Sequence, residues 1–297
     1  MSNTQTFTAA VIALVVGLVS FFGLTMIAFT AAPLPTFDAD NFSNPSVINN
    51  PWLSLPVGQE FEYEGETDEG TETIEIEISG DTKTVMGIKT LVYRDIVWVD
   101  GELVEDTRDY LAQDDDGNIW YFGEDVDNYE DGKLADHDGA WLAGSGGAKP
   151  GYWMPANPKV GDSYRQEYLK GEAEDEAEVI SLNAKVKIGL GTYNNCLKTR
   201  DTTPLEPDVV EYKYYCKQVG GMVLEEKPED GERIELVEYE IEDGTDDDED
   251  ESEDELAFEE DDDDDEDEQS GVSNVNTASL QMRLIALLQQ LIALLSR

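Results

Sequence analysis

The sequence predicts a mostly β domain, an antiparallel meander that forms a curved sheet or half-barrel, with an N-terminal apolar helix and a short C-terminal amphipathic helix. Three observations predict this class. Apolar and polar residues alternate with a period of two along many short segments, as they do on strands with one buried face. Glycine-containing turns separate these segments at short intervals. Between them we find no long pattern of helical period.

The first element, residues 1–35, contains 24 uncharged residues from Ala9 to Ala32. As a helix this run is long enough to cross about 30 Å of hydrocarbon. A cleaved signal normally has a shorter apolar stretch after a basic segment, whereas the first basic side chain here is Lys83. Small residues at 28–32 nevertheless permit cleavage. We expect either a retained anchor, with residues 9–32 in the membrane, or a cleaved signal, and an extracytoplasmic protein in both cases.

Residues 36–51 are rich in Asn, Pro and Ser and are predicted as a polar linker. The β domain is expected over residues 52–241. Its clearest strand covers residues 71–79, where three isoleucines alternate with glutamates. Tight turns are expected at Asp100-Gly101 and Asp131-Gly132. Further strand-like segments are 91–99, 164–169, 177–182, 193–199, 209–216 and 233–241.

Residues 242–277 are predicted as an acidic disordered spacer, because 21 of the 68 acidic side chains lie in 242–268 without a basic residue. Residues 278–297 are predicted as an amphipathic helix, since LIALLQQ is followed by LIALLSR at heptad spacing. Its apolar stretch is too short to span a membrane. We expect this helix to associate with copies of itself or with a partner helix, with interfacial membrane binding as the alternative.

The formal net charge is −49, from 68 acidic and 19 basic side chains. The folded part remains acidic when the spacer is left out. A surface of this charge repels phosphate backbones, so we expect no nucleic-acid partner. It suits cations, basic partners or a saline environment.

The chain has two cysteines, Cys196 and Cys216. A turn-rich stretch at 203–208 lies between the strand-like segments that carry them. If the hairpin is centred near residue 206, the two cysteines lie directly opposite each other, close enough to bridge. In an oxidising compartment we expect a structural disulfide, with free buried thiols as the alternative.

Acidic side chains offer a candidate ligand site. The stretch 114–118 resembles a calcium loop, but it lacks the spacing and the helical flanks of an EF-hand, and a hairpin turn accounts for it better. Carboxylates on neighbouring turns could still supply the oxygen ligands that Ca²⁺ takes. We keep a weak Ca²⁺ site as a hypothesis and expect no other cofactor. Its candidate ligands are Asp114, Asp116, Asp125, Asp127 and Asp131.

Aromatic residues are the other candidate. Trp120 follows the acidic turn, and Trp141 and Trp153 lie in an irregular loop expected at about 136–160. Together they could line a groove for a sugar or a peptide. Aromatic side chains lie more often in the core, and both interpretations stay open.

Three long motifs resemble an uncharacterised β domain that recurs in exported bacterial proteins. They are DDDGNIWYFGEDVDNYEDGK at 114–133, PANPKVGDSYRQEYLKGEAEDEAEVISL at 155–182 and NCLKTRDTTPLEPDVVEYKYY at 195–215. The likeness covers about residues 50–236. It implies an exported domain associated with the cell envelope. Since no activity is attached to that domain, it implies no catalytic residue.

We therefore predict a non-enzymatic exported cell-envelope or surface protein whose β domain binds a ligand or partner. One alternative is a carboxylate-based hydrolase of envelope or environmental polymers, which would need a cleft where two acids have opposed environments. The other is a weak Ca²⁺-binding protein. The chain has one histidine and no nucleophile motif such as G-x-S-x-G, so no catalytic residue is assigned.

Overall fold

The computed structural model describes residues 31–241, which form a domain of antiparallel strands. The predicted mostly β class is thereby confirmed. Most of the predicted N-terminal helix, the acidic spacer and the predicted helix at 278–297 lie outside the described residues. Within residues 31–241, no helix has the length and hydropathy that a membrane crossing requires. This part begins with an extended segment and a 3-10 turn, η1 (Ala39–Asn41).

In the described part of the chain, 16 strands form one sheet, and β1 (Asn49–Asn50) pairs separately with β2 (Leu53–Ser54). In chain order the sheet contains β3 (Gln59–Thr67), β4 (Gly70–Ile78), β5 (Thr82–Val85), β6 (Ile88–Val99), β7 (Glu102–Gln113), β8 (Ile119–Glu130), β9 (Lys133–Asp136), β10 (Trp141–Leu142), β11 (Lys149–Met154), β12 (Ser163–Arg165), β13 (Glu167–Tyr168), β14 (Glu176–Ile188), β15 (Gly191–Thr203), β16 (Glu206–Cys216), β17 (Gly221–Lys227) and β18 (Glu232–Ile241).

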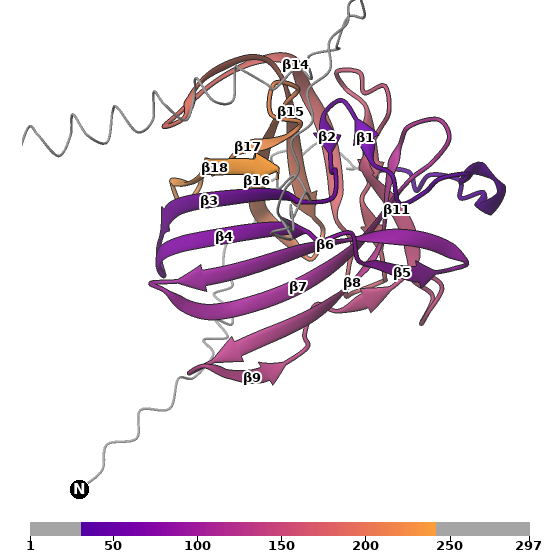
Figure 1. The fold of residues 1–297 in the computed structure, drawn as a ribbon, viewed down its shortest axis with the longest axis horizontal. Helices are drawn as coiled ribbons and strands as arrows, with labels where there is room; N and C mark the ends of the chain where they lie inside the picture. The colour runs from indigo at the N-terminus through magenta and orange to yellow at the C-terminus, as the bar shows by residue number, and fades with distance from the viewer. Residues whose placement is uncertain (1–30, 242–297) are drawn as a thin grey trace, which may run out of the picture. The chain divides into compact units, whose positions relative to one another are not determined.

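The hydrogen-bonded path through the sheet is β12-β14-β15-β16-β17-β18-β3-β4-β6-β7-β8-β11-β13. β5 pairs with β6, and β9 and β10 pair with β8. Most neighbours follow each other in the chain, as a meander requires. β18 and β3 are an exception, because they are neighbours in the sheet but far apart in the chain, with residues 233–241 beside residues 59–66. Figure 1 shows this pair, with β18 in orange beside β3 in indigo.

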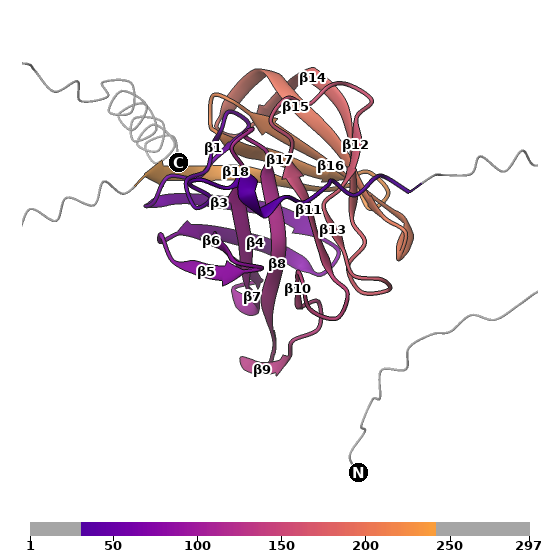
Figure 2. The ribbon, with the colours of Figure 1, turned by 90° about the vertical axis from the view of Figure 1, so that its right-hand side faces the viewer.

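The sheet is open, and the strands at the two ends of its path are consecutive in the chain. β12 ends at Arg165 and β13 begins at Glu167, so Gln166 alone separates them. The sheet curves strongly, as Figures 1 and 2 show, and both ends of the path meet at this segment. β11 passes so close that a Cβ atom on Gly151 would lie 2.3 Å from the backbone oxygen of Arg165. We call residues 163–168, which carry both ends, the seam.

Local patterns in the sequence predicted the strands well. The segment 71–79 corresponds to β4, and the segments 91–99, 177–182 and 193–199 lie within β6, β14 and β15. The turns at Asp100-Gly101 and Asp131-Gly132 have positive φ at both residues, 51° and 81° in the first and 53° and 69° in the second. Positive φ at both central residues is typical of tight hairpin turns that match the twist of a sheet.

The β15–β16 hairpin has the predicted register. Leu197 lies opposite Tyr215 and Asp201 lies opposite Glu211. The same register faces Cys196 with Cys216, and the two form a disulfide with their Cα atoms 4.4 Å apart. The predicted disulfide is therefore confirmed in the structure. The turn itself is tighter than predicted, since β15 ends at Thr203 and an irregularity in β16 takes up the extra residues.

Two stretches differ from the sequence prediction. Residues 36–51, predicted as a linker, lie against the sheet, because Phe37 and Phe42 make ring contacts with Trp120 and Phe122. The few apolar side chains of this polar stretch thus find partners on β8. The loop expected at about 136–160 contains β10 and β11, both of which pair with β8.

Tyrosines and acids share the face that the sheet encloses. Tyr63 on β3 and Tyr215 on β16 are buried, and burial followed by their mutual electrostatic effect raises the pKa of Tyr63. Their strands are separated in the sheet by β17 and β18. Burial likewise raises the pKa of Asp95 on β6 to about 8.

Candidate functional site

Asp114 and Asp116, two of the proposed calcium ligands, lie in the turn between β7 and β8. The Asp114 carboxylate accepts hydrogen bonds from the backbone of Asp116 and Asn118, from the Asn118 side chain, and from the indole nitrogen of Trp120 at 2.8 Å. Asp116 accepts a bond of 3.0 Å from Asn41. These acids shape the turn and connect it to the N-terminal segment. The interpretation of 114–118 as a hairpin turn is confirmed.

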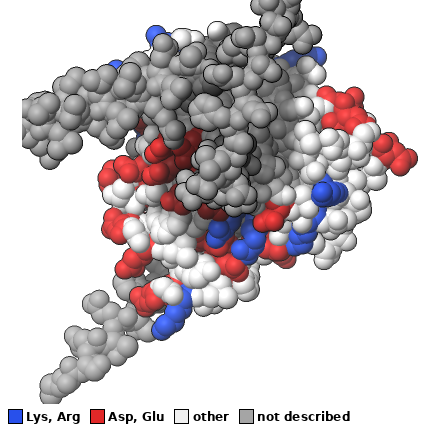
Figure 3. Space-filling model, in the orientation of Figure 1, with Lys and Arg blue, Asp and Glu red and all other residues white. Residues whose placement is uncertain are grey.

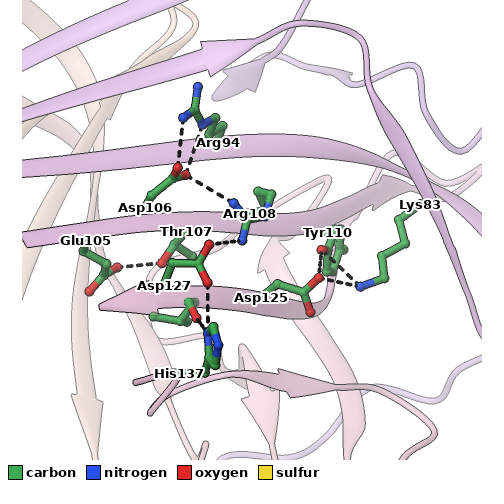
Figure 4. Close-up of polar contacts among 11 residues, drawn as sticks. Lys83, Arg94, Glu105, Asp106, Thr107, Arg108, Tyr110, Asp125, Asp127 and His137 are labelled. Carbon is green, nitrogen blue, oxygen red and sulfur yellow. Dashed lines mark hydrogen bonds and ion pairs between the residues drawn. The ribbon is translucent and has the colours of Figure 1, made fainter. Parts of the chain in front are cut away.

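Asp125 and Asp127 belong to a row of ion pairs across β5, β6, β7 and β8 (Figure 4). The Lys83 ammonium lies 2.8 Å from Asp125, and the Arg108 guanidinium lies 2.7 Å from Asp127. Burial alone would raise the pKa of Asp125, but hydrogen bonds from Lys83 and Tyr110 lower it. Basic side chains likewise lie among acidic ones on the face in Figure 3. Both aspartates are thus paired with cations of the protein.

Asp131 stands apart from the other four, as an exposed residue of the turn between β8 and β9. Among residues 31–241, no three His, Cys, Asp or Glu side chains are grouped so that they could hold a metal ion. The Ca²⁺ site stays a prediction, and each of its paired candidate ligands would have to exchange a present partner for the ion.

The three tryptophans of the predicted aromatic groove fall into two groups. Trp120 contacts Tyr152 at 4.7 Å between ring centroids and packs under the N-terminal segment. Trp141 and Trp153 both contact Tyr121, at 5.2 and 4.9 Å. Trp120 and Trp141 are only 2% and 4% exposed. The structure therefore brings Trp141 and Trp153 together around Tyr121 and places Trp120 in another cluster.

An acidic pocket of about 360 Å³ lies next to the seam. Glu124 and Glu167 reach it from β8 and β13, near one end of the sheet path. Asp201 and Glu211 reach it from β15 and β16, near the other end. The pocket exists because the curved sheet brings its two ends together. Its remaining lining is Gly139, Gln166, Glu172, Ala173, Asp175, Thr202, Thr203, Leu205, Glu206, Val209 and Lys213.

Of the described residues that line this pocket, Lys213 alone is basic. Its ammonium lies 3.3 Å from Glu211 and 3.5 Å from Glu225 on β17. Although burial opposes its charge, these two carboxylates raise its pKa well above the ordinary value. Lys213 in turn lowers the pKa of Glu211. The Lys227 ammonium lies 3.6 and 3.9 Å from the same two glutamates, so two lysines share two carboxylates.

Within residues 31–241, no basic side chain forms an ion pair with the other acids of the pocket. Burial raises the pKa of Asp201 to about 6, although Lys213 opposes the shift. Burial also raises the pKa of Glu124 to about 7. The pKa of Glu167 rises to about 8 because of burial and then of the charges of Asp175 and Glu124. Near pH 7, burial therefore keeps Glu167 largely protonated and Glu124 partly so, while Asp201 is mostly ionised.

Buried hydrogen-bond donors lie beside the acids of the pocket. Asp201 is only 7% exposed, and hydrogen bonding from the Thr199 side chain on the same strand opposes the rise of its pKa. Hydrogen bonding from the Trp141 side chain likewise opposes the rise of the pKa values of Glu124 and Glu167. Buried polar groups in native proteins nearly always have such partners. These contacts hold the acids in place under the pocket surface.

A second acidic depression, of about 250 Å³, lies over β18, β3 and β4. Here Glu62 faces Glu75 on one side and Glu238 on the other. Burial and then these two charges raise the pKa of Glu62. Like charges directly opposite each other destabilise a sheet. This outer groove is therefore a second place where carboxylates from neighbouring strands lie close together.

Sequence reasoning did not identify the pocket acids, because acidic residues occur everywhere in this chain. One signal was present. The hairpin register that predicts the disulfide also places Asp201 opposite Glu211 and Thr199 opposite Lys213. The approach of Glu124 and Glu167 had no local signal, since it depends on the seam.

Comparison with known proteins gives no family. No family model matches the chain, and no curated protein matches it. The resemblance to an exported bacterial domain therefore remains an expectation. Among solved structures, a protein of Parabacteroides distasonis provisionally described as a lipoprotein matches with a TM-score of 0.34 and 12% identity. The match covers 64% of this chain and 98% of that one, and similarity at this level carries no functional conclusion.

Proposed function

We propose that this protein is a non-enzymatic, exported binding protein of the cell envelope or surface, and that its β domain takes its ligand in the acidic pocket at the seam. The observation that carries the proposal is the pocket itself, where acidic side chains from β8, β13, β15 and β16 line one cavity beside the seam. The pocket volume of about 360 Å³ falls in the range of small-molecule sites, roughly 300–1,000 Å³.

Two features support export. The Cys196–Cys216 disulfide is of the kind that persists in oxidising compartments and is rare in the cytosol. The uncharged run from Ala9 to Ala32 has the length of a membrane-inserting segment. If the protein is exported, protease added to intact cells digests the β domain. Digestion that occurs only after lysis would contradict the proposal.

A second candidate is carboxylate-based hydrolysis, which one observation favours. Glu211 and Glu167 line the same pocket with pKa values shifted in opposite directions, as a base and an acid require. Glu211, however, is engaged by Lys213 and by Lys227. Hydrolysis of envelope glycans by the wild-type chain, lost in Glu167→Gln, would establish the enzyme and displace the binding proposal.

The binding proposal is tested by amide chemical shifts of the ¹⁵N-labelled full chain. The probes are butylammonium, 1-butanol and butyrate, which share a four-carbon stem and differ in charge. We expect at least one of them to shift the amides of Thr202, Thr203 and Ala173, which line the pocket. If none shifts these amides, the pocket is not a ligand site.

A further inference from the structure

We propose that the N-terminal segment attaches the β domain directly to its membrane, so that one end of the domain is held against the lipid headgroups. We call this the proximal end, and it consists of the loop at 169–175 and the turn at 203–209. It follows from where the chain becomes fixed on the domain, from how little chain separates that point from the uncharged run, and from the residues around it. This surface and its partner, a bilayer, are independent of what the acidic pocket binds.

The chain is fixed on the domain from Ala32 onward. Ala32 is only 7% exposed, and its backbone nitrogen donates a hydrogen bond of 2.9 Å to the Glu176 carboxylate. The Arg165 guanidinium donates to the carbonyl oxygen of Ala32 at 3.2 Å, and the Arg165 backbone donates to that of Pro33 at 3.3 Å. Arg165 is itself 7% exposed and forms an ion pair of 3.0 Å with Glu176. The segment therefore joins the seam beside β12, as Figure 2 shows.

Little chain separates this fixed point from the uncharged run. The run of 24 residues ends at Ala32 itself. As a helix it would measure about 36 Å, which exceeds a hydrocarbon core of about 30 Å by only about 6 Å. The headgroup layer of one leaflet has about this thickness, since a whole bilayer measures about 40–45 Å. Ala32 and its neighbours on the domain therefore lie at the level of the headgroups. Residues 36–51 come after this point and cannot act as a spacer.

Retention of the run is favoured over its removal. Signal cleavage requires small residues in an arrangement like Ala-x-Ala. The alanines at the end of the run are Ala28, Ala31 and Ala32, and no two of them are separated by a single residue. A cut after Ala32 would also remove the carbonyl oxygen to which the buried Arg165 guanidinium donates. The run therefore stays attached as the tether of the domain.

The surface around Ala32 is the proximal end. Glu176 begins β14 and pairs with Thr202, next to the turn between β15 and β16. Paired strands lie about 4.8 Å apart and Leu205 follows three residues after Thr202, so Leu205 lies within roughly 15 Å of Glu176. Leu205 and Val209 are 43% and 38% exposed. Exposed apolar side chains that lie close together are typical of surfaces that contact a membrane or a protein. Both residues also line the acidic pocket, which therefore lies at the same end.

Charge does not supply the attraction to lipid. Exposed Glu172, Glu206 and Asp208 outweigh exposed Lys170 at this end. Anionic lipid would repel such a surface. The tether supplies the contact instead, because attachment gives the proximal end a high effective concentration at the bilayer. We therefore expect the contact on zwitterionic lipid, with little dependence on salt.

The test places the ¹⁵N-labelled full chain in bilayer discs of phosphatidylcholine, with a nitroxide on the headgroup of a few lipids. The nitroxide broadens the signals of nearby amides. We expect the amides of Gly171 and Leu205 to lose most of their intensity and that of Leu190 to keep it. Leu190 lies beyond the other end of β14, a strand of 13 residues and roughly 40 Å at about 3.3 Å per residue. The same chain in discs without nitroxide gives the reference intensity.

An insertion separates the tether from other causes of contact. An insert of about twelve Gly and Ser residues between Thr30 and Ala31 adds a root-mean-square length of roughly 20 Å. The broadening at Gly171 and Leu205 should then be lost, because the domain can leave the headgroups and turn. The matched control carries the same insert between Ile241 and Glu242, outside the tether, and should keep the broadening.

Three results would overturn the inference. Mass spectrometry of the protein from cell membranes could find an N-terminus within residues 29–33, which would mean that the tether is removed. Equal broadening at Leu190 and Leu205 would show that the domain has no fixed side toward the bilayer. Broadening at Leu205 that persists in the variant with the insert before Ala31 would show that direct attachment does not hold the proximal end. None of these results depends on the ligand of the acidic pocket, so the proposed function stands or fails separately.

Discussion

At the scale of single residues, the charge and stability of the pocket depend on the few basic side chains that lie near its carboxyl groups. Lys213 and Lys227 together pair with Glu211 and Glu225, whereas burial raises the pKa values of Asp201, Glu124 and Glu167. Removing one member of a buried ion pair leaves the other charge uncompensated, which costs more than the pair contributed. Stability and ligand choice should therefore both depend on these few side chains.

Lys213→Met is expected to lower the free energy of unfolding at neutral pH. It leaves Glu211 and Glu225 to share Lys227 alone, at 3.6 and 3.9 Å, at a cost on the order of 1 kcal/mol, since Lys227 still screens the two carboxylates and the Lys213 side chain is 27% exposed. Urea denaturation measures the change. Lys185→Met is the control, because Lys185 is an exposed residue of β14, and it should change stability by less than about 0.5 kcal/mol. Equal effects would show that Lys213 has no special role.

The pH dependence of stability should follow the raised pKa values of the pocket acids. Folding raises the pKa of Asp201 to about 6, of Glu124 to about 7, and of Asp95 and Glu167 to about 8. A carboxyl whose pKa is raised in the folded state favours folding while it is protonated, and loses that contribution as pH rises through the folded value. We expect thermal stability to fall between about pH 5 and about pH 9.

The variant Glu167→Gln isolates one of these groups. Because glutamine does not titrate, the decline of stability between about pH 6 and about pH 9 should be shallower than in the wild type. Glu64→Gln, on the exposed part of β3, is the control for a change of net charge. A wild-type profile that is flat or that rises over this range would contradict the assignment of raised pKa values to the pocket.

At the scale of elements, the β15–β16 hairpin connects the disulfide with the pocket. Its register places Cys196 opposite Cys216 near the open end of the hairpin and Asp201 opposite Glu211 nearer the turn. β16 then contributes Lys213 and β17 contributes Glu225. The spacing of the carboxylates around Lys213 is thus set by the same backbone pairing that the disulfide holds.

Replacing both cysteines by serine should lower the free energy of unfolding by about 3 kcal/mol, because the disulfide closes a loop between residues 20 apart and restricts the unfolded chain. Denaturation of the oxidised protein, compared with the double variant, measures this. The wild type in reducing buffer serves as the matched control and should behave like the variant. If reduction leaves the unfolding midpoint unchanged, the bond does not stabilise the hairpin.

At the scale of the whole domain, the seam completes the curved sheet. The hydrogen-bonded path is open, yet its two ends belong to one short segment, so the sheet can enclose a face without a continuous ring of hydrogen bonds. The pocket lies beside this joint, with Gln166 in its wall. Disturbing the seam should therefore affect stability and ligand binding together.

Gly151→Ala tests the seam. A Cβ atom at this position would lie 2.3 Å from Arg165 O and 2.5 Å from Gln166 O, so backbone has to move. We expect a loss of about 2 kcal/mol in unfolding free energy, in the range of overpacked sites, and weaker binding of any probe that shifts the pocket amides. Gly189→Ala is the matched control, because no atom lies within 4 Å of its added Cβ. Equal stability of the two variants would show that the close approach does not constrain the sheet.

The sequence alone determined the local features of this protein. Two-residue alternation predicted the strand at residues 71–79. Asp-Gly turns predicted the hairpins at residues 100 and 131, and a symmetric hairpin register predicted the disulfide. Each of these is decided within about 20 residues, where backbone geometry and side-chain periodicity leave few alternatives. Only the tertiary structure decided that β18 pairs with β3, that Phe37 and Phe42 pack on β8, and which of the many acids lie buried. Glu124 and Asp201 are 77 positions apart in the sequence, and they line one pocket because the curvature of the whole sheet brings its ends together. That curvature is the sum of twist over many strands, and no local pattern contains it.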